Sequence, residues 1–97
     1  MATSMIKKSM DITTGYFSKN NIAVGANAFV EETYNVSKSG YTPIGIITIN
    51  KSGSGSGHCV ISQFRISDNN AIVAIRNLNS TAATVSMSIT VLYKELT

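Results

Sequence analysis

The chain has 97 residues, 43% of them hydrophobic and 13% charged, and a formal net charge of +3. This length leaves room for one domain, because two separate cores would each be too small to be stable, and the composition excludes a disordered chain. The basic residues are dispersed rather than clustered, which argues against nucleic-acid binding, because that binding needs several neighbouring cations.

The N-terminal part of the chain has the weakest pattern. We expect residues 1–10 to form a flexible tail and residues 11–97 to form the single domain. Within that domain, Asp11 to Ser18 and Ile22 to Val24 predict one or two strands.

From Ala28 the pattern becomes regular and alternates with a period of two, which predicts a strand with one buried face. Ala28, Val30, Tyr34 and Val36 lie on the predicted inner face, and Glu32 is the one charged residue among them. A segment rich in turn-forming residues follows and leads into the next strand.

Two later segments, 44–50 and 71–78, are apolar on both faces. A monomeric β-sandwich buries only one face of each sheet, so the second face needs a cover. Either long loops or the N-terminal segment cover it, or copies of the chain cover it in an oligomer; we favour the oligomer, because a β domain of this size gains much from partners. In the segment 44–50, the pattern places Ile44 and Ile46 on one face and Ile47 and Ile49 on the other. In the segment 71–78, it places Ile72 and Ala74 on the second face.

Between these segments, Ser52 to Gly57 read SGSGSG. Strong strand patterns flank this stretch closely, which predicts a flexible hairpin tip rather than a tether between domains. A phosphate-binding loop would need a helix after the glycines, whereas a strand follows here. On that strand, 58–67, the pattern places Val60, Phe64 and Ile66 on one side and Cys59, Gln63, Arg65 and Ser67 on the other.

The C-terminal part has the clearest alternation. Asp68 to Asn70 and residues 77–83 carry turn-forming residues on either side of the segment 71–78. The last strand alternates without a break, and it places Val85, Met87, Ile89, Val91 and Tyr93 on the inner face. Six or seven short strands with regular turns predict an all-β fold, an antiparallel β-sandwich.

The residues suggest no catalytic centre. His58 and Cys59 are neighbours on a strand and so face apart, and the same holds for Glu31 and Glu32. A hydrolase would need two carboxylates that meet in a groove. No set of residues suits a metal ion, so we expect no enzyme activity, no cofactor and no metal, with Cys59 packed as a small apolar side chain.

The single cysteine and the lack of long apolar runs bear on the compartment. Cys59 has no cysteine to pair with in the chain. No apolar run reaches the roughly 18 residues of a membrane span, and the first residues lack the apolar stretch of a signal peptide. We therefore expect no membrane partner, and synthesis in a reducing cytoplasm or export within a larger assembly.

Two stretches resemble a known family. SKSGYTPIGIITIN and AIVAIRNLNSTAATVSMSITVLYKEL resemble the C-terminal tip domains of tail-fibre and receptor-binding proteins of bacteriophages and prophages of Gram-positive gut bacteria. The resemblance covers Glu31 to Leu96 and contains no single diagnostic motif. It implies a small β-sandwich that assembles as a homotrimer and binds a cell-surface saccharide or protein. The chain starts with its own Met1 and has no shaft repeats, so we expect a fibre fragment or a small virion protein.

Together these observations predict a jelly-roll-like homotrimer in the virion, assembled in the cytoplasm of the bacterial host. It would bind a host-surface glycan or protein through loops at one end of the sandwich. The alternative is a purely structural virion protein, such as a capsid decoration, a head fibre or a fibre assembly domain, whose partners are itself and other virion proteins. Aromatic rings stack on sugars and amides bond to hydroxyl groups, so the candidate ligand contacts are Tyr41, His58, Asn69 and Asn79.

Overall fold

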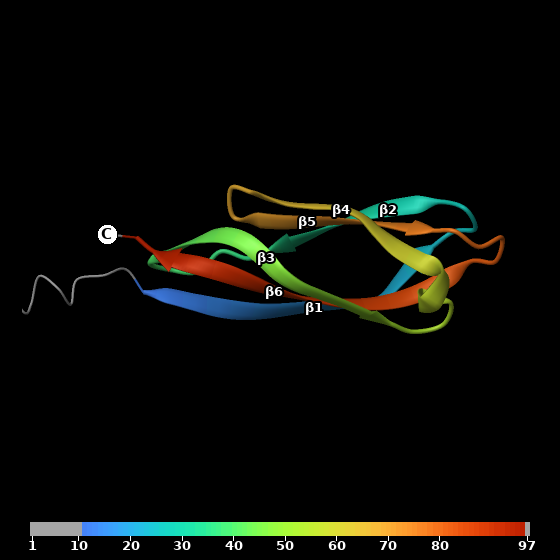
Figure 1. The fold of residues 1–97 in the computed structure, drawn as a ribbon, viewed down its shortest axis with the longest axis horizontal. Helices are drawn as coiled ribbons and strands as arrows, with labels where there is room; N and C mark the ends of the chain where they lie inside the picture. The colour runs from blue at the N-terminus through green and yellow to red at the C-terminus, as the bar shows by residue number, and fades with distance from the viewer. Residues whose placement is uncertain (1–10, 97) are drawn as a thin grey trace, which may run out of the picture.

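The computed structural model describes residues 11–96, which form six strands and one short 3-10 turn, η1 (Ser56–His58) (Figure 1). Most of these residues lie in strands, which confirms the prediction of an all-β fold. The strands are β1 (Ile12–Val24), β2 (Phe29–Asn35), β3 (Tyr41–Ser52), β4 (Cys59–Ser67), β5 (Asn70–Asn77) and β6 (Ala83–Glu95).

The strands form two antiparallel sheets that lie face to face over a common core (Figure 1). Sheet A has the order β1-β6-β3, and sheet B has the order β2-β5-β4. Consecutive strands alternate between the sheets, and only β4 and β5 are joined within one sheet, by the predicted tight turn at Asp68. The first and last of these strands, β1 and β6, are therefore hydrogen-bonded neighbours.

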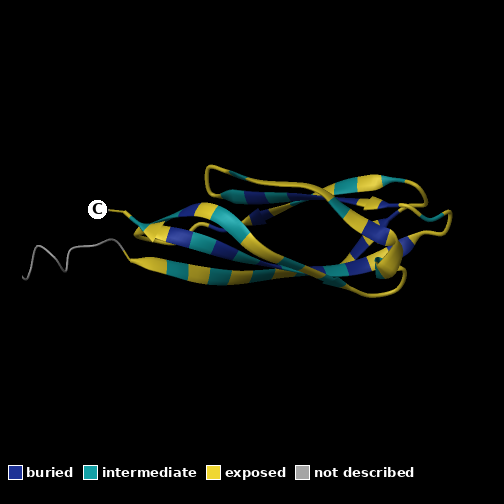
Figure 2. Cartoon of the chain, in the orientation of Figure 1, coloured by how far each residue is buried: buried dark blue, intermediate teal, exposed yellow. Residues whose placement is uncertain are grey.

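The core lies between the central strands β5 and β6. The alternation predicted for β6 is confirmed, because its five inner residues are buried while the residues between them are more exposed (Figure 2). Ala71, Val73 and Ile75 of β5 are buried opposite them. Removal of these apolar side chains from water, at about 1.5–3 kcal/mol for each large one, is the main stabilising term of the fold.

Glu32 lies on the inner face of β2, where the alternation predicts it. Lys19 lies on the inner face of β1, since it pairs with the buried Met87. The Lys19 amine lies 3.3 Å from a carboxylate oxygen of Glu32 and 5.3 Å from the centre of the Tyr34 ring. An ion pair thus bridges the two sheets along the open side between β1 and β2.

Two register shifts in β3 contradict the faces predicted for this strand. Ile44 and Ile47 are extra residues in the ladder between β3 and β6, at β-bulges. As a result, Ile46 and Ile49 pair with the buried residues of β6 and both face inward. The prediction that Ile49 lies on a second apolar face is therefore wrong, because a period of two does not continue through a bulge.

The faces predicted for β4 are also wrong in part. A register shift between Ile61 and Gln63 adds one residue to this strand. Cys59, which pairs with the buried Asn77, therefore lies inside with Ile61, and Val60 lies outside. Cys59 is 1% exposed, which confirms that it packs as an apolar side chain.

The second apolar face of β5 exists, as predicted, but neighbouring side chains cover part of it. Ala74 is only 4% exposed, although it lies on the outer face of sheet B. Arg65 of β4 lies 3.5 Å from a carboxylate oxygen of Glu31 of β2, so this pair reaches across the central strand. Side chains of the flanking strands thus shield Ile72 and Ala74 within the sheet itself.

The SGSGSG segment is not a hairpin tip, because β3 and β4 belong to opposite sheets. It crosses between the layers and packs on the start of β6, where the Ser54 carbonyl accepts a hydrogen bond from the Thr84 N–H at 3.0 Å. Gly53 has a φ of +109°, and a Cβ there would lie 2.5 Å from the Thr84 carbonyl oxygen. Glycine is therefore required at this position by both conformation and space.

Asn77 ties three segments together at this end of the fold. Its side chain is buried, and its Nδ2 group donates to the carbonyl oxygens of Val24, Gly25 and Thr81 at 2.9–3.3 Å. Its Oδ1 atom accepts from the N–H of Asn79 at 2.9 Å. One amide thus satisfies backbone groups from the β1–β2 and β5–β6 connections.

Asn77→Ala is expected to lower the free energy of unfolding by about 2–4 kcal/mol, because it leaves several buried backbone groups without partners. Urea denaturation followed by circular dichroism measures this change. Asn69→Ala, in the exposed β4–β5 turn, is the matched control and should change stability by less than about 0.5 kcal/mol. Equal stability of the two variants would contradict the role given to Asn77.

The Tyr34 hydroxyl joins the two sheets and generates a prediction for alkaline pH. It donates to the Met87 carbonyl at 3.2 Å, and burial, with a smaller contribution from the charge of Glu32, raises the pKa of Tyr34 from 10.0 to about 12. The unfolded chain loses this proton near pH 10 while the folded chain keeps it. Stability should therefore fall as the pH rises from about 10 to about 12.

Tyr34→Phe removes this titration, so the variant should lose less stability than the wild type over the same pH range. Unfolding free energies from urea denaturation at several pH values test this. Part of the decline should remain in the variant, because burial also raises the pKa of Tyr93. Parallel pH profiles for wild type and variant would show that Tyr34 does not contribute.

Candidate functional site

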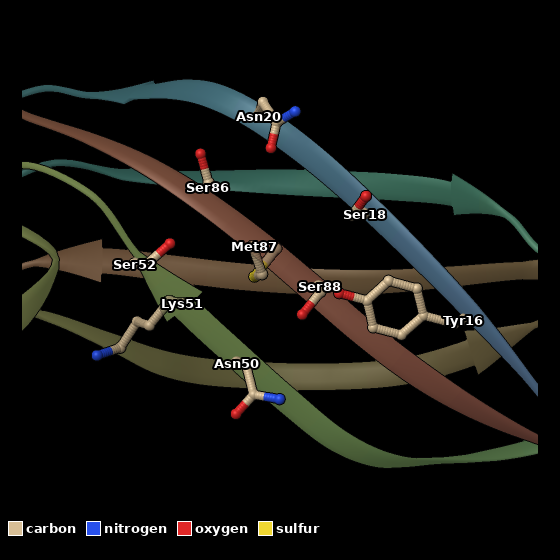
Figure 3. Close-up of a pocket in the computed structure, with 9 residues that line it drawn as sticks. All are labelled: Tyr16, Ser18, Asn20, Asn50, Lys51, Ser52, Ser86, Met87 and Ser88. Atoms are coloured by element: carbon tan, nitrogen blue, oxygen red, sulfur yellow. The ribbon is translucent and has the colours of Figure 1, made fainter.

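The outer face of sheet A carries a shallow polar depression of about 220 Å³ (Figure 3). It arises because outward positions on β1, β6 and β3 hold serine, asparagine and tyrosine, while the inward positions hold core residues. The inward-facing Lys51 and Met87 line it as well. The name polar face is used below for the outward-facing residues of this lining: Tyr16, Ser18, Asn20, Asn50, Ser52, Ser86 and Ser88.

The polar face is built in rows across the three strands. Ser88 of β6 lies opposite both Ser18 of β1 and Asn50 of β3. In the next row along β6, Ser86 lies opposite Ser52. Neighbouring strands are about 4.8 Å apart, so these rows present hydroxyl and amide groups as a regular array.

A bulge in β1 shapes one border of the polar face. The β1–β6 register shifts between Lys19 and Ile22, and Asn21 there has a φ of +59°. The N–H of Asn21 lies 3.5 Å from the Ser86 hydroxyl, so the bulged backbone reaches the central strand of the depression. Bulges redirect the side chains next to them, here Asn20.

Tyr16 supplies the one aromatic ring of the polar face. Its side chain is 69% exposed and lies on β1, one row along from Ser18 (Figure 3). A ring that remains in water over a polar surface has an apolar face ready for stacking and a hydroxyl ready for hydrogen bonding.

The side chains of the polar face offer many hydrogen-bonding groups. Serine hydroxyl and asparagine amide groups both donate and accept hydrogen bonds. No member of the polar face carries a charge, and the Lys51 amine at its border donates to the Ser56 carbonyl at 3.1 Å.

The four candidate contacts predicted from the sequence do not come together. Tyr41 begins β3 opposite Glu95, and Asn69 lies in the β4–β5 turn at the same end of the fold as the C-terminus (Figure 1). His58 and Asn79 lie in the connections at the opposite end (Figure 1). These two pairs are separated by the length of the strands, so the four residues cannot contact one small ligand.

Each of the four residues has a structural partner. The Tyr41 ring packs edge-on against the Tyr93 ring, with the centroids 6.4 Å apart. The backbone carbonyl of Asn69 accepts from Val36, that of His58 accepts from Leu78, and that of Asn79 accepts from Asn27, all at 2.9 Å. A role of their side chains in ligand binding stays a prediction.

Few ionisable side chains lie close together in the described part of the chain. Glu31 and Glu32 face opposite sides of sheet B, as predicted, and each pairs with a different basic residue. Among residues 11–96, no group of three or more His, Cys, Asp and Glu is placed to hold a metal ion. In the same residues, no helix has the length and apolar character to cross a membrane.

Comparisons with family models, curated proteins and solved structures gave no match for this chain. The likeness to phage tip domains therefore rests on the two quoted sequence stretches alone. The chemistry of the polar face, which does not depend on that likeness, is the more direct guide to function.

Proposed function

We propose that this chain is an adhesion module that binds glycans non-covalently through its polar face, within a phage or prophage tail-fibre or receptor-binding protein. The observation that carries the proposal is the uncharged array of hydroxyl and amide groups beside the exposed ring of Tyr16. The proposed ligand is a host-surface saccharide, and the proposed location is the virion.

The chemistry of a sugar matches this array. Each sugar hydroxyl both donates and accepts hydrogen bonds, as do the serine and asparagine side chains on β1, β6 and β3. The C–H faces of a sugar ring are apolar and stack on aromatic rings such as that of Tyr16. The one charged side chain that lines the depression, Lys51, donates its amine to the Ser56 carbonyl, so a neutral glycan fits the array better than an acidic one.

The shallowness of the depression favours weak binding at each site. A fibre tip compensates for weak single sites by presenting several copies, which raises the overall avidity. We therefore propose that the chain forms a homo-oligomer, which the family resemblance implies is a trimer. The strand order supports a jelly-roll type, because β1-β6-β3 over β2-β5-β4 is the order of an eight-stranded jelly roll without two of its strands.

The second candidate function is a purely structural virion protein that binds other virion proteins and no glycan. The exposed apolar side chains of Ile47 and Phe64 favour it, because surfaces of this kind often contact other subunits. The two functions differ in the surface they use, so substitutions on the polar face separate them.

Tyr16→Ala is expected to weaken glycan binding by about tenfold, since it removes the stacking ring. Binding of the purified wild type to an array of neutral and acidic bacterial surface glycans identifies a probe, and titration calorimetry with that probe then measures the variant. Ser88→Val, which removes a central hydroxyl group but keeps strand propensity, should also weaken binding.

Tyr41→Ala is the matched control, because this tyrosine lies in the same sheet but outside the polar face. It should leave glycan affinity unchanged. Loss of binding in Tyr41→Ala together with full binding in Tyr16→Ala would move the site to the loops that the sequence predicts. No binding by the wild type to any glycan, beside tight association with a virion protein, would favour the structural alternative.

A further inference from the structure

The two open sides of this two-layered fold differ in chemistry. On the side between β1 and β2, the inner-facing Lys19 and Glu32 form an ion pair. On the side between β3 and β4, a cleft of about 280 Å³ opens. We call apolar side the residues that line this cleft, Ile46, Ile47, Thr48, Ile49, Ile61 and Phe64.

The apolar side exposes large side chains to solvent. Ile47 is 52% exposed and Phe64 is 54% exposed, and Ile44, the other bulge residue of β3, is about half exposed. Soluble proteins commonly protect an edge strand with inward-pointing charges, as the Lys19–Glu32 pair does on the opposite side. The residues that line this cleft include no charged side chain.

We propose that the apolar side is the surface through which copies of this chain associate, with Ile47 and Phe64 at its centre. This inference deepens the proposed function, because it rests on the homo-oligomer proposed there and names the surface that forms it. The partner is another copy of the same chain.

The absence of charge in the cleft favours a copy of the chain as the partner. When a surface contacts its own copies, a charged group near the symmetry axis meets its own equivalent, and such contacts between like charges weaken association. The hydroxyl group of Thr48 is the one polar side-chain group on the apolar side, so nothing there repels a copy. Apolar side chains at the centre of a surface are the usual arrangement of an interface.

The dimensions of this side also fit. The 12 residues of β3 span roughly 40 Å at about 3.3 Å each. The two sheets lie about 10 Å apart, and with the thickness of the sheets included the side is roughly 20 Å wide. The whole side thus measures roughly 800 Å², with the apolar side at its centre, and an interface that used all of it would match what one partner contributes to a stable interface.

A comparison with Phe29, which is as exposed as Phe64, shows what distinguishes the apolar side. Phe29 is 54% exposed on the outer face of sheet B, but the Arg76 guanidinium lies 5.3 Å from the centre of its ring. A basic side chain thus already contacts Phe29 within the monomer. Phe64 has the same exposed fraction and lines an uncharged cleft instead.

The test compares Phe64→Glu with Phe29→Glu, two identical substitutions at equally exposed residues. Light scattering and sedimentation equilibrium measure the mass in solution. We expect the wild type at two or three times 10.3 kDa, Phe29→Glu at the wild-type mass, and Phe64→Glu with association weakened at least tenfold. Circular dichroism checks that each variant is folded.

If Phe64→Glu does not fold, chemical cross-linking tests the same surface. Cys59, the one natural cysteine, is buried, so Ile47→Cys places a single accessible thiol on the apolar side. A short bis-maleimide should join copies of this variant at low protein concentration. Phe29→Cys is the control and should stay uncross-linked.

The outcomes separate the parts of the proposal. A wild type that stays at 10.3 kDa at high concentration would overturn both the homo-oligomer and the surface, whereas glycan binding would be judged by Tyr16→Ala alone. The wild type could instead be an oligomer while the folded Phe64→Glu variant has the same mass and Ile47→Cys gives no cross-link. That result would overturn the proposed surface but not the homo-oligomer. If the wild type is monomeric but another virion protein binds it through the apolar side, that protein is the partner, and the proposed contact between copies is wrong.

Discussion

The contact between the inner faces of β5 and β6 is the constraint on which the rest of the structure depends. These central strands bury the apolar side chains of both layers, and the flanking strands attach to them by hydrogen bonds. Because β6 directs its apolar residues inward, its outward positions are free to carry serine and threonine. The polar face is thus a direct consequence of the same alternation that builds the core, and Asn77 holds the connections that close one end.

The proposed binding and assembly surfaces meet on a single strand without competing. β3 directs Asn50 and Ser52 to the outside of sheet A, where they join the polar face, while Ile47 lies at its free edge on the apolar side. Bulges allow this, because an extra residue changes which way the following side chains point. A glycan on the polar face and a neighbouring copy on the apolar side could therefore be held at the same time, as an avid adhesion module requires.

Sequence periodicity predicts those strands in which nothing interrupts the alternation. β6 and β2 were predicted correctly, down to Glu32 on the inner face, whereas bulges in β3 and β4 moved Ile49 and Cys59 to faces that a strict period of two does not predict. The SGSGSG segment has the composition of a turn, but composition does not tell whether the next strand pairs in the same sheet. The polar face could not be predicted at all, because it combines β1, β3 and β6, and their adjacency depends on the strand order. Ser86 and Ser88 lie on the solvent side of the last strand, whereas Ser18 and Ser52 come from strands far from it in the sequence.

The pairing of β1 with β6 has a consequence for synthesis on the ribosome. β6 is the last of the described strands to be made, yet it occupies the middle of sheet A. Until it leaves the exit tunnel, β1 and β3 have no strand between them, and their inner side chains lack the layer that buries them. Such distant pairings slow folding, so the nascent chain passes through a stage in which it is open to wrong associations. The domain can therefore be completed only after β6 has left the exit tunnel.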